Sequence, residues 1–386
     1  MKLHRAQVAA YLSERFHAPV EVIRLGNLSE LLLAQLTPLA AEMDQASAGT
    51  DAAQALKTFG YGKPVLVECR VDGKPTTLVI HTAATNQFGH EQRSDRAAEM
   101  LLCYDTYNQL PNHAPALDVG VVTHDDQLLS VADGDEFFVL TEYVQGEPYA
   151  KDLQRLRNSG EVTGVDLRRA RQLALYLAKI HAVRQTEPAL YLRRIRDTLG
   201  SGQGIMGLID SYPANNALVD WGWLEELEKT CVKWRWQLKR KTHRLAQVHG
   251  DFHPFNILFD STGNLHVLDR SRGAWGEPAD DVVCLAINYL FFSLQRNGRL
   301  TSPFEQLWNI FWNTYLNETN DHELLAVVAP FFAWRALVLA SPLWYNVTDS
   351  VRYALLGAAR AILQLGVFDP TEINAYMSLG DEVLVG

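Results

Sequence analysis

Three polar side chains in one stretch of the sequence have the types and spacing that phosphoryl transfer requires. Asp251 lies within the run 248–259, Asn256 follows it five residues later, and Asp269 follows thirteen residues after Asn256. A hydroxyl that attacks a γ-phosphate needs a carboxylate within hydrogen-bond reach, and the phosphates need Mg²⁺ held by hard oxygen ligands. The pattern therefore predicts Asp251 as the base, with Asn256 and Asp269 as the metal ligands.

Short strands are expected to position these side chains. The apolar residues 257–259 leave the loop as a strand, and Ser-Thr-Gly-Asn at 261–264 indicates a hairpin turn. The returning strand, 265–268, would then bring Asp269 to the same cleft.

The order His249-Gly250-Asp251, one residue, His253, two residues and Asn256 resembles the aminoglycoside phosphotransferase and choline kinase family. Protein kinases keep the same Asp-to-Asn spacing but carry Arg where this chain has Gly. The resemblance implies a bilobal protein kinase-like α+β fold, with an antiparallel sheet in a small N-terminal lobe and a mainly helical C-terminal lobe. It also implies ATP or GTP with Mg²⁺ as cofactors, and supporting roles for His249 and His253.

The resemblance continues through residues 268–281, with two departures. Asp281 falls where the family's last Asp holds the catalytic loop by hydrogen bonds. The run 270–272, Arg-Ser-Arg, stands where the family has an aromatic residue and often a second carboxylate, and Glu277 replaces Asp. Losing that carboxylate could reduce two metal sites to one, and the arginines could receive a phosphate or an anionic acceptor. For Arg272, a salt bridge to Glu277 or Asp281 is the expected role, with substrate contact as the alternative.

An antiparallel pair of strands is predicted upstream, at 65–71 and 76–81, with a turn at 72–75. A short glycine-rich turn precedes the pair, at the place where the family covers the ATP phosphates. Its predicted nucleotide-binding residues are Gly60, Gly62 and Lys63.

The second of these strands ends in His81, where kinases carry a Lys that binds the α- and β-phosphates and pairs with a helix Glu. Glu99 in the predicted helix 96–102 is the candidate for that Glu, with Asp95 as the competitor. Three interpretations stay open. Lys63 supplies the missing positive charge, or His81 works protonated beside Glu99, or the protein is a nucleotide-binding pseudokinase with a regulatory or scaffold role.

The predicted N-terminal lobe spans 1–144 and begins with a helical extension, 1–56. The C-terminal lobe spans 145–386 and contains the catalytic and metal loops at 249–281. This division follows the resemblance together with the change from alternating to helical hydrophobic patterns.

Two further strands, 116–122 and 137–144, are expected before the lobes meet. The second strand resembles the family's hinge, where backbone groups near Glu142 and Val144 would bind adenine. An ordinary strand end would explain the same residues. A helix is expected at 165–183, from its apolar spacing.

Composition narrows the function further. The 386 residues are 47% hydrophobic and carry a net charge of −10, which argues against sequence-independent nucleic-acid binding. The longest apolar run, 282–294, is shorter than the roughly 20 residues that cross a bilayer. The four cysteines have no paired spacing, and the N-terminal segment lacks the apolar stretch of a signal peptide, so a cytoplasmic location is expected.

The acceptor is expected to be a small molecule with a hydroxyl, and transfer of AMP in place of phosphate is a weaker alternative. Aromatic side chains can hold a quaternary ammonium group by cation–π attraction. Four aromatic residues near the C-terminal end of the chain have helical spacing, however, which favours packing in the core. They are Trp308, Phe311, Trp312 and Tyr315.

Overall fold

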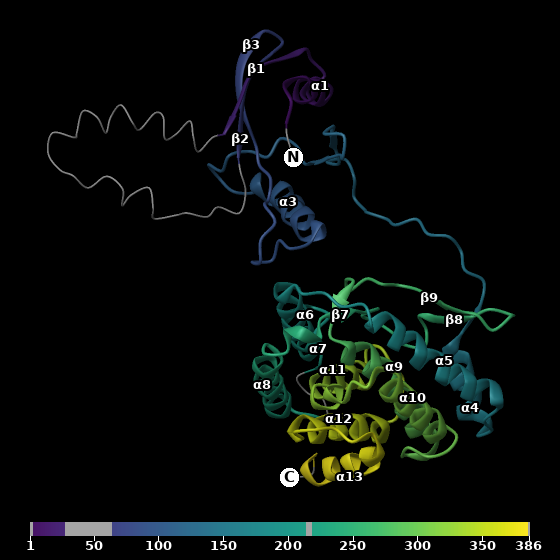
Figure 1. Ribbon diagram of the computed structural model, residues 1–386. Coiled ribbons are helices and arrows are strands. Elements are labelled where there is room, and N and C mark those ends of the chain that lie inside the picture. Colours follow the sequence, from purple (N-terminus) through teal and green to yellow (C-terminus); the bar gives the residue numbers. More distant parts are fainter. Residues whose placement is uncertain (1–2, 28–63, 214–217, 385–386) are drawn as a thin grey trace. The chain divides into compact units, whose positions relative to one another are not determined.

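The computed structural model describes residues 3–27, 64–213 and 218–384 (Figure 1). The chain divides into two compact units, Met1–Thr141 and Glu142–Gly386, here called the N-terminal and C-terminal units. The first contains an antiparallel sheet and the second is mostly helical, which confirms the predicted α+β class.

The N-terminal unit is built around a three-stranded antiparallel sheet with the order β1-β2-β3. Val8 and Leu12 of the first helix form one buried cluster with Val67 and Cys69 of the sheet. A separate pair, β4 and β5, lies outside this sheet. In chain order the elements are α1 (Arg5–Phe16), β1 (Val20–Asn27), β2 (Val65–Val71), β3 (Lys74–Ile80), α3 (Arg93–Tyr107), β4 (Gly120–Val122) and β5 (Leu128–Ser130).

The predicted hairpin of β2 and β3 is confirmed. Its turn residues, Asp72 and Gly73, have φ angles of 50° and 76°. Two-residue hairpin loops favour positive φ at both positions, and Asp-Gly is one of the sequences that adopt it most easily.

The expected helical extension, 1–56, is correct for α1 but wrong for Val20–Asn27, which form β1. Valine and leucine alternate with polar residues there, and the strand gains hydrogen bonds by pairing with β2. The register shifts between Val22 and Arg24, so Ile23 is displaced from the ladder and stays partly exposed. The glycine-rich turn with Gly60, Gly62 and Lys63 lies outside the described residues.

The strand expected at 137–144 is absent: these residues form no helix or strand, although the shorter β4 falls within the expected 116–122. Phe138 and Tyr143 are 92% and 90% exposed. A strand is stable only when a neighbour accepts its hydrogen bonds, and none of the described strands pairs with this segment. Glu142 and Val144, the predicted hinge residues, therefore lie in irregular chain.

The C-terminal unit combines two small sheets with a helical body. β6 (Glu147–Pro148), β8 (Ile257–Phe259) and β9 (Leu265–Val267) form one sheet, and β7 (Ala246–Gln247) pairs with β10 (Trp275–Gly276). The helices are α4 (Tyr149–Ser159), α5 (Gly164–His181), α6 (Pro188–Gly200), α7 (Ile205–Asp210), α8 (Trp221–Leu238), α9 (Pro278–Asn297), α10 (Phe304–Thr319), α11 (Ala329–Ala340), α12 (Asp349–Gln364) and α13 (Ile373–Leu384). Short 3₁₀ turns occupy Thr242–Arg244, His322–Ala326 and Pro370–Glu372.

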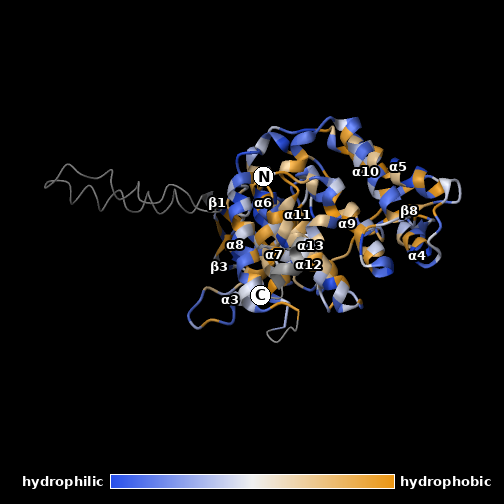
Figure 2. Cartoon of the chain, turned by 90° about the horizontal axis from the view of Figure 1, so that it is seen from below, coloured by the Kyte–Doolittle hydropathy of each residue, from blue (hydrophilic) through white to orange (hydrophobic). Residues whose placement is uncertain are grey.

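The core of the C-terminal unit is centred on α9, which is buried without interruption from Pro278 to Leu294. Helices α4, α10, α11 and α12 pack against it. Figure 2 shows hydrophobic residues along α9 and α11. The four aromatic residues predicted to be core are buried, as expected: Trp308, Phe311, Trp312 and Tyr315. Among the described helices, none is long and apolar enough to span a membrane.

Candidate active site

The predicted catalytic loop, residues 249–256, is held in place by the first turn of α9. The two carboxylate oxygens of Asp281 accept hydrogen bonds from the backbone N–H groups of His249 and Gly250, at 2.6 and 2.7 Å. The carboxylate also lies 3.2 Å from Nε2 of buried His181. Burial alone would raise the pKa of Asp281, but these hydrogen bonds outweigh it and hold the pKa below its usual value.

An aromatic anchor fixes the loop from its other side. Phe252 is fully buried and stacks on Tyr176 of α5, with ring centroids 5.6 Å apart. Inside the loop, the N–H of His253 donates to the carbonyl of Asp251, and the N–H of Asn256 donates to the carbonyl of His253, both at 2.9 Å. The loop backbone is therefore fixed before any substrate binds.

Asp251 is 9% exposed and lies between two arginines. Its Oδ1 accepts hydrogen bonds from Nη1 of Arg335 at 2.7 Å and from Nη1 of Arg272 at 3.1 Å. Burial would raise the pKa of Asp251, but the two guanidinium groups outweigh it, so the pKa lies below its ordinary value. The other oxygen, Oδ2, lies 3.8 Å from Nε2 of His253, too far for a direct hydrogen bond.

Glycine at position 250 is required by the backbone and by the packing. Gly250 has a φ angle of +88°, which side-chain-bearing residues rarely adopt. A Cβ atom there would lie 3.2 Å from the Cβ of Arg272 and 3.4 Å from Nη2 of Arg194. The smaller residue therefore lets the arginines approach the loop.

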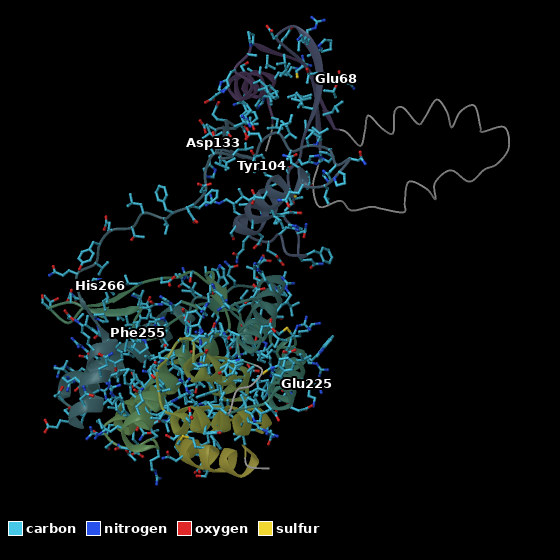
Figure 3. All side chains as sticks on the ribbon, turned by 180° about the vertical axis from the view of Figure 1, so that it is seen from behind. Glu68, Tyr104, Asp133, Glu225, Phe255 and His266 are labelled. Carbon is cyan, nitrogen blue, oxygen red and sulfur yellow. The ribbon has the colours of Figure 1, made fainter. Side chains whose placement is uncertain are left out.

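The two predicted metal ligands flank the β8–β9 hairpin, in the part of the C-terminal unit where Figure 3 labels Phe255 and His266. The N–H of Leu268 donates to the carbonyl of Asn256 at 2.9 Å, which brings the following residue, Asp269, to the end of the loop. Asn256 Nδ2 donates to the loop backbone, leaving its amide oxygen available.

The donor set at the hairpin fits a magnesium ion. Asn256 and exposed Asp269 supply hard oxygens, and Mg²⁺ is commonly held by one or two such protein ligands while phosphates and water complete its shell. Within the described part of the chain, no group of three or more His, Cys, Asp and Glu side chains is arranged to hold a metal without such help.

The prediction that Arg272 forms a salt bridge with Glu277 or Asp281 is wrong. Arg272 instead pairs with Asp251, and its Nε donates to Oε1 of Gln203 at 3.3 Å. Both expected partners are already occupied, since Asp281 binds the loop backbone and Glu277 receives the guanidinium of Arg244 at 2.8–3.0 Å.

Sequence reasoning missed a buried ion network beside Asp251. Arg335 Nη2 lies 2.7 Å from one oxygen of Asp280, and Arg194 Nη2 lies 2.6 Å from the other. Arg335 sits in α11, an otherwise apolar helix. A single arginine in such a helix was the available signal, because a buried charge needs a partner.

The predicted nucleotide residues of the N-terminal unit are only partly described. His81 follows β3 directly and is exposed. Glu99 of α3 lies 2.9 Å from Nε2 of His90, and among the described residues it makes no ion pair with His81. His90 was not among the predicted site residues, and nothing in the local sequence pattern distinguishes it.

The fold and the site together define a phosphotransferase of the small-molecule kinase class. The APH phosphotransferase enzyme family matches residues 90–309, more than half of the chain, and the chain belongs to this family. The match includes the catalytic loop, Asp269 and Asp281.

Several solved structures are similar to the chain. An ethanolamine kinase from Plasmodium vivax is 13% identical, with 85% of this chain and 80% of that one covered and a TM-score of 0.34. A choline kinase from Cryptosporidium parvum is 11% identical over 90% and 94%, with a TM-score of 0.33. Choline kinase LicA from Streptococcus pneumoniae is 12% identical over 86% and 99%, with a TM-score of 0.34. No curated protein sequence matches the chain.

Proposed function

We propose that this phosphotransferase moves the γ-phosphate of Mg-ATP, or Mg-GTP, to a hydroxyl of a small molecule, with Asp251 as the base. The observation that carries the proposal is the environment of Asp251. Its Oδ1 is occupied by Arg335 and Arg272, while Oδ2 has no hydrogen bond to the described residues. The lowered pKa keeps the carboxylate ionised and able to accept a proton.

The reaction follows from these roles. The acceptor hydroxyl donates its hydrogen bond to Oδ2 of Asp251, and its oxygen attacks the γ-phosphorus as the proton passes to the carboxylate. The bond from the γ-phosphorus to the bridging oxygen breaks, and the nucleoside diphosphate leaves. Magnesium held by Asn256 and Asp269 would neutralise charge on the phosphates. The fixed backbone of the catalytic loop supports this proposal by orienting the base.

Asp251→Asn should lower kcat for ADP release by about 10²-fold or more, because the amide cannot accept the proton. Nucleotide affinity should change little, since Asp251 is not a proposed metal ligand. The measurement is ADP release with an accepted hydroxyl compound, together with the rise in melting temperature caused by Mg-ATP.

Asp349→Asn is the matched control, because it removes one carboxylate from an exposed position on α12. It should leave both measurements unchanged. A full rate in the Asp251 variant would remove this residue from the mechanism.

The alternative, a nucleotide-binding pseudokinase, is favoured by one observation. His81 stands at the position of the kinase lysine and is exposed, and Glu99 lies beside His90. Under that alternative, Mg-ATP raises the melting temperature but no hydroxyl compound releases ADP. Lys63→Ala and His81→Ala then show which of the two side chains supplies positive charge to the phosphates. Only substitution of the residue that binds phosphate should reduce the rise in melting temperature caused by Mg-ATP.

A further inference from the structure

Arg272 lies beside the proposed base, and one of its guanidinium nitrogens has no hydrogen bond to the described residues. Its guanidinium lies over the ring of Trp334, 4.9 Å from the centroid, and bonds to Asp251 and Gln203 through Nη1 and Nε. Its side chain is 18% exposed, and among the described residues no hydrogen bond involves Nη2. A guanidinium fixed in this way can donate from Nη2 to a second anion through a charge-assisted hydrogen bond.

Arg335 shows how one guanidinium can serve two carboxylates in this site. Its Nη1 donates to Asp251 and its Nη2 donates to Asp280, both at 2.7 Å. Arg272 makes only the first of these two contacts. Among the described residues, no carboxylate occupies the equivalent position on Arg272.

The charges around the base favour an anion. Three guanidinium groups, from Arg194, Arg272 and Arg335, face two carboxylates, Asp251 and Asp280, so the cluster carries one excess positive charge. The next carboxylate, Asp281, bonds instead to the backbone N–H groups of His249 and Gly250 and lies 3.2 Å from His181.

Tyr345, which lies near Asp251 and Arg335, adds no negative charge at neutral pH. Burial raises the pKa of Tyr345 to about 12, so this phenol stays protonated.

At the aromatic ring beside the guanidinium groups, a cationic acceptor would compete with the protein's own cations. Trp334 is the aromatic ring nearest the guanidinium groups, and the protein's own cations already cover it. Arg335 and Arg194 lie 4.1 and 5.9 Å from its centroid, in addition to Arg272. An ammonium group would have to displace an arginine to gain the cation–π attraction.

We propose that the acceptor carries an anionic group, a carboxylate or a phosphate, on a carbon near the reacting hydroxyl, and that Arg272 binds this group. The inference rests on the proposed kinase function. Arg272 would bridge Asp251 and the acceptor anion, which holds the hydroxyl against Oδ2 of Asp251. Arg272 is then the residue that selects hydroxy acids or hydroxyalkyl phosphates over neutral and cationic alcohols.

The test compares short acceptors that differ mainly in charge: glycerate, glycerol 3-phosphate, glycerol and 2-amino-1,3-propanediol. The full chain is assayed with Mg-ATP for ADP release, and each compound is also titrated without nucleotide while the melting temperature is followed. Because charge-assisted hydrogen bonds are stronger than neutral ones, kcat/KM for the preferred anionic acceptor should exceed kcat/KM for glycerol by about tenfold or more. Glycerate and glycerol 3-phosphate distinguish a carboxylate from a phosphate.

Arg272→Gln should bring the ratio of anionic to neutral acceptor close to one and remove the anion-dependent rise in melting temperature. Because Arg272 also touches Asp251, the variant changes kcat for every acceptor, whereas a purely structural role leaves the ratio unchanged. Arg240→Gln, which removes one exposed charge at the end of α8, is the control and should preserve both responses.

The outcomes separate this inference from the proposed function. Equal responses to all four compounds, or a preference that persists in Arg272→Gln, overturns the anion site while ADP release still supports a kinase. An Arg272-dependent rise in melting temperature without ADP release from any acceptor supports the anion site and counts against the kinase function.

Discussion

Asp269 has a backbone conformation that allows a clean test of its predicted role. Its φ angle is +56°, in the left-handed region that Asn and Asp adopt more readily than other side-chain-bearing residues. Asp269→Asn therefore preserves the backbone and changes only the charge of the ligand. An alanine at this position would add backbone strain to the loss of the ligand.

Asp269→Asn should raise the Mg²⁺ concentration that gives half-maximal ADP release by about tenfold or more. Loss of even an outer-shell partner of a metal ligand lowers metal affinity by at least about tenfold. A neutral amide oxygen attracts Mg²⁺ less strongly than a carboxylate. The measurement is a magnesium titration at fixed ATP. Asp126→Asn is the control, because Asp126 also has positive φ, at 60°, and lies in the N-terminal unit.

An unchanged magnesium requirement in Asp269→Asn would leave Asn256 as the only predicted protein ligand. The distinction matters because the run 270–272 lacks the second carboxylate that the family often carries there. Arg270 does not replace it. Its guanidinium donates to the carbonyls of Val248 and Ala274, both at 3.0 Å, and so closes the loop that follows Asp269.

At the scale of elements, the start of α9 organises the site. Three acidic residues at this end are fully buried, and each has a different partner: Glu277 binds Arg244, Asp280 binds two arginines, and Asp281 binds the catalytic loop. The positive end of the helix dipole favours carboxylates at these positions. One helix end therefore sets the positions of the loop and of the arginines beside it.

Asp281→Asn should lower the free energy of unfolding by about 1–3 kcal/mol, because its amide group would present an N–H to a backbone N–H that it cannot satisfy. ADP release should fall as well, since the loop backbone loses an acceptor. Urea denaturation and an activity assay measure the two effects.

The pH dependence follows from the lowered pKa of Asp281. A depressed carboxyl pKa contributes stability that is fully present above the unfolded value, about 3.9, and is lost as pH falls through the folded value. The stability difference between wild type and Asp281→Asn should therefore shrink as the pH falls from about 3.9 through the folded value. A difference that stays constant there would contradict this account.

Asp166→Asn provides the matched comparison at another helix start. Asp166 is also buried and accepts hydrogen bonds from Thr163 at the beginning of α5, the end of the helix opposite to His181. Its substitution should cost stability while the folded protein retains its activity. Loss of activity in both variants alike would mean that destabilisation, and not loop position, explains the effect of Asp281→Asn.

At the scale of the whole molecule, the two units have separate hydrophobic cores. One core lies within the N-terminal unit and includes Val8 and Val67, and the other extends from Tyr149 to Met377. None of the described residues belongs to both. A core of its own is the physical requirement for a domain that folds independently.

A fragment of residues 142–386 should therefore unfold in one cooperative transition. It should show little rise in melting temperature with Mg-ATP, because Gly60, Lys63 and His81, which are predicted to contact the phosphates, are missing from it. Calorimetry with and without nucleotide measures both properties. An aggregated or non-cooperative fragment would show that the C-terminal unit depends on the rest of the chain, and a full Mg-ATP response would remove the N-terminal residues from the binding site.

The sequence alone determined the features that depend on local patterns. The spacing of Asp251, Asn256 and Asp269 predicted the chemistry and the family, because catalytic groups on one loop and hairpin keep fixed separations along the chain. The β2–β3 hairpin and helix α5 also followed from turn residues and hydrophobic periodicity, which act over a few neighbouring residues.

Only the tertiary structure decided which distant residues meet. Strand β1 pairs with β2, which follows residues 28–63 in the chain. Arg335 donates a hydrogen bond to Asp251, 84 residues away along the chain. Arg272 bonds to Asp251 because both of its expected partners are taken by other groups. Such pairings depend on how helices pack and on the need of each buried charge for a partner, and local sequence patterns contain neither.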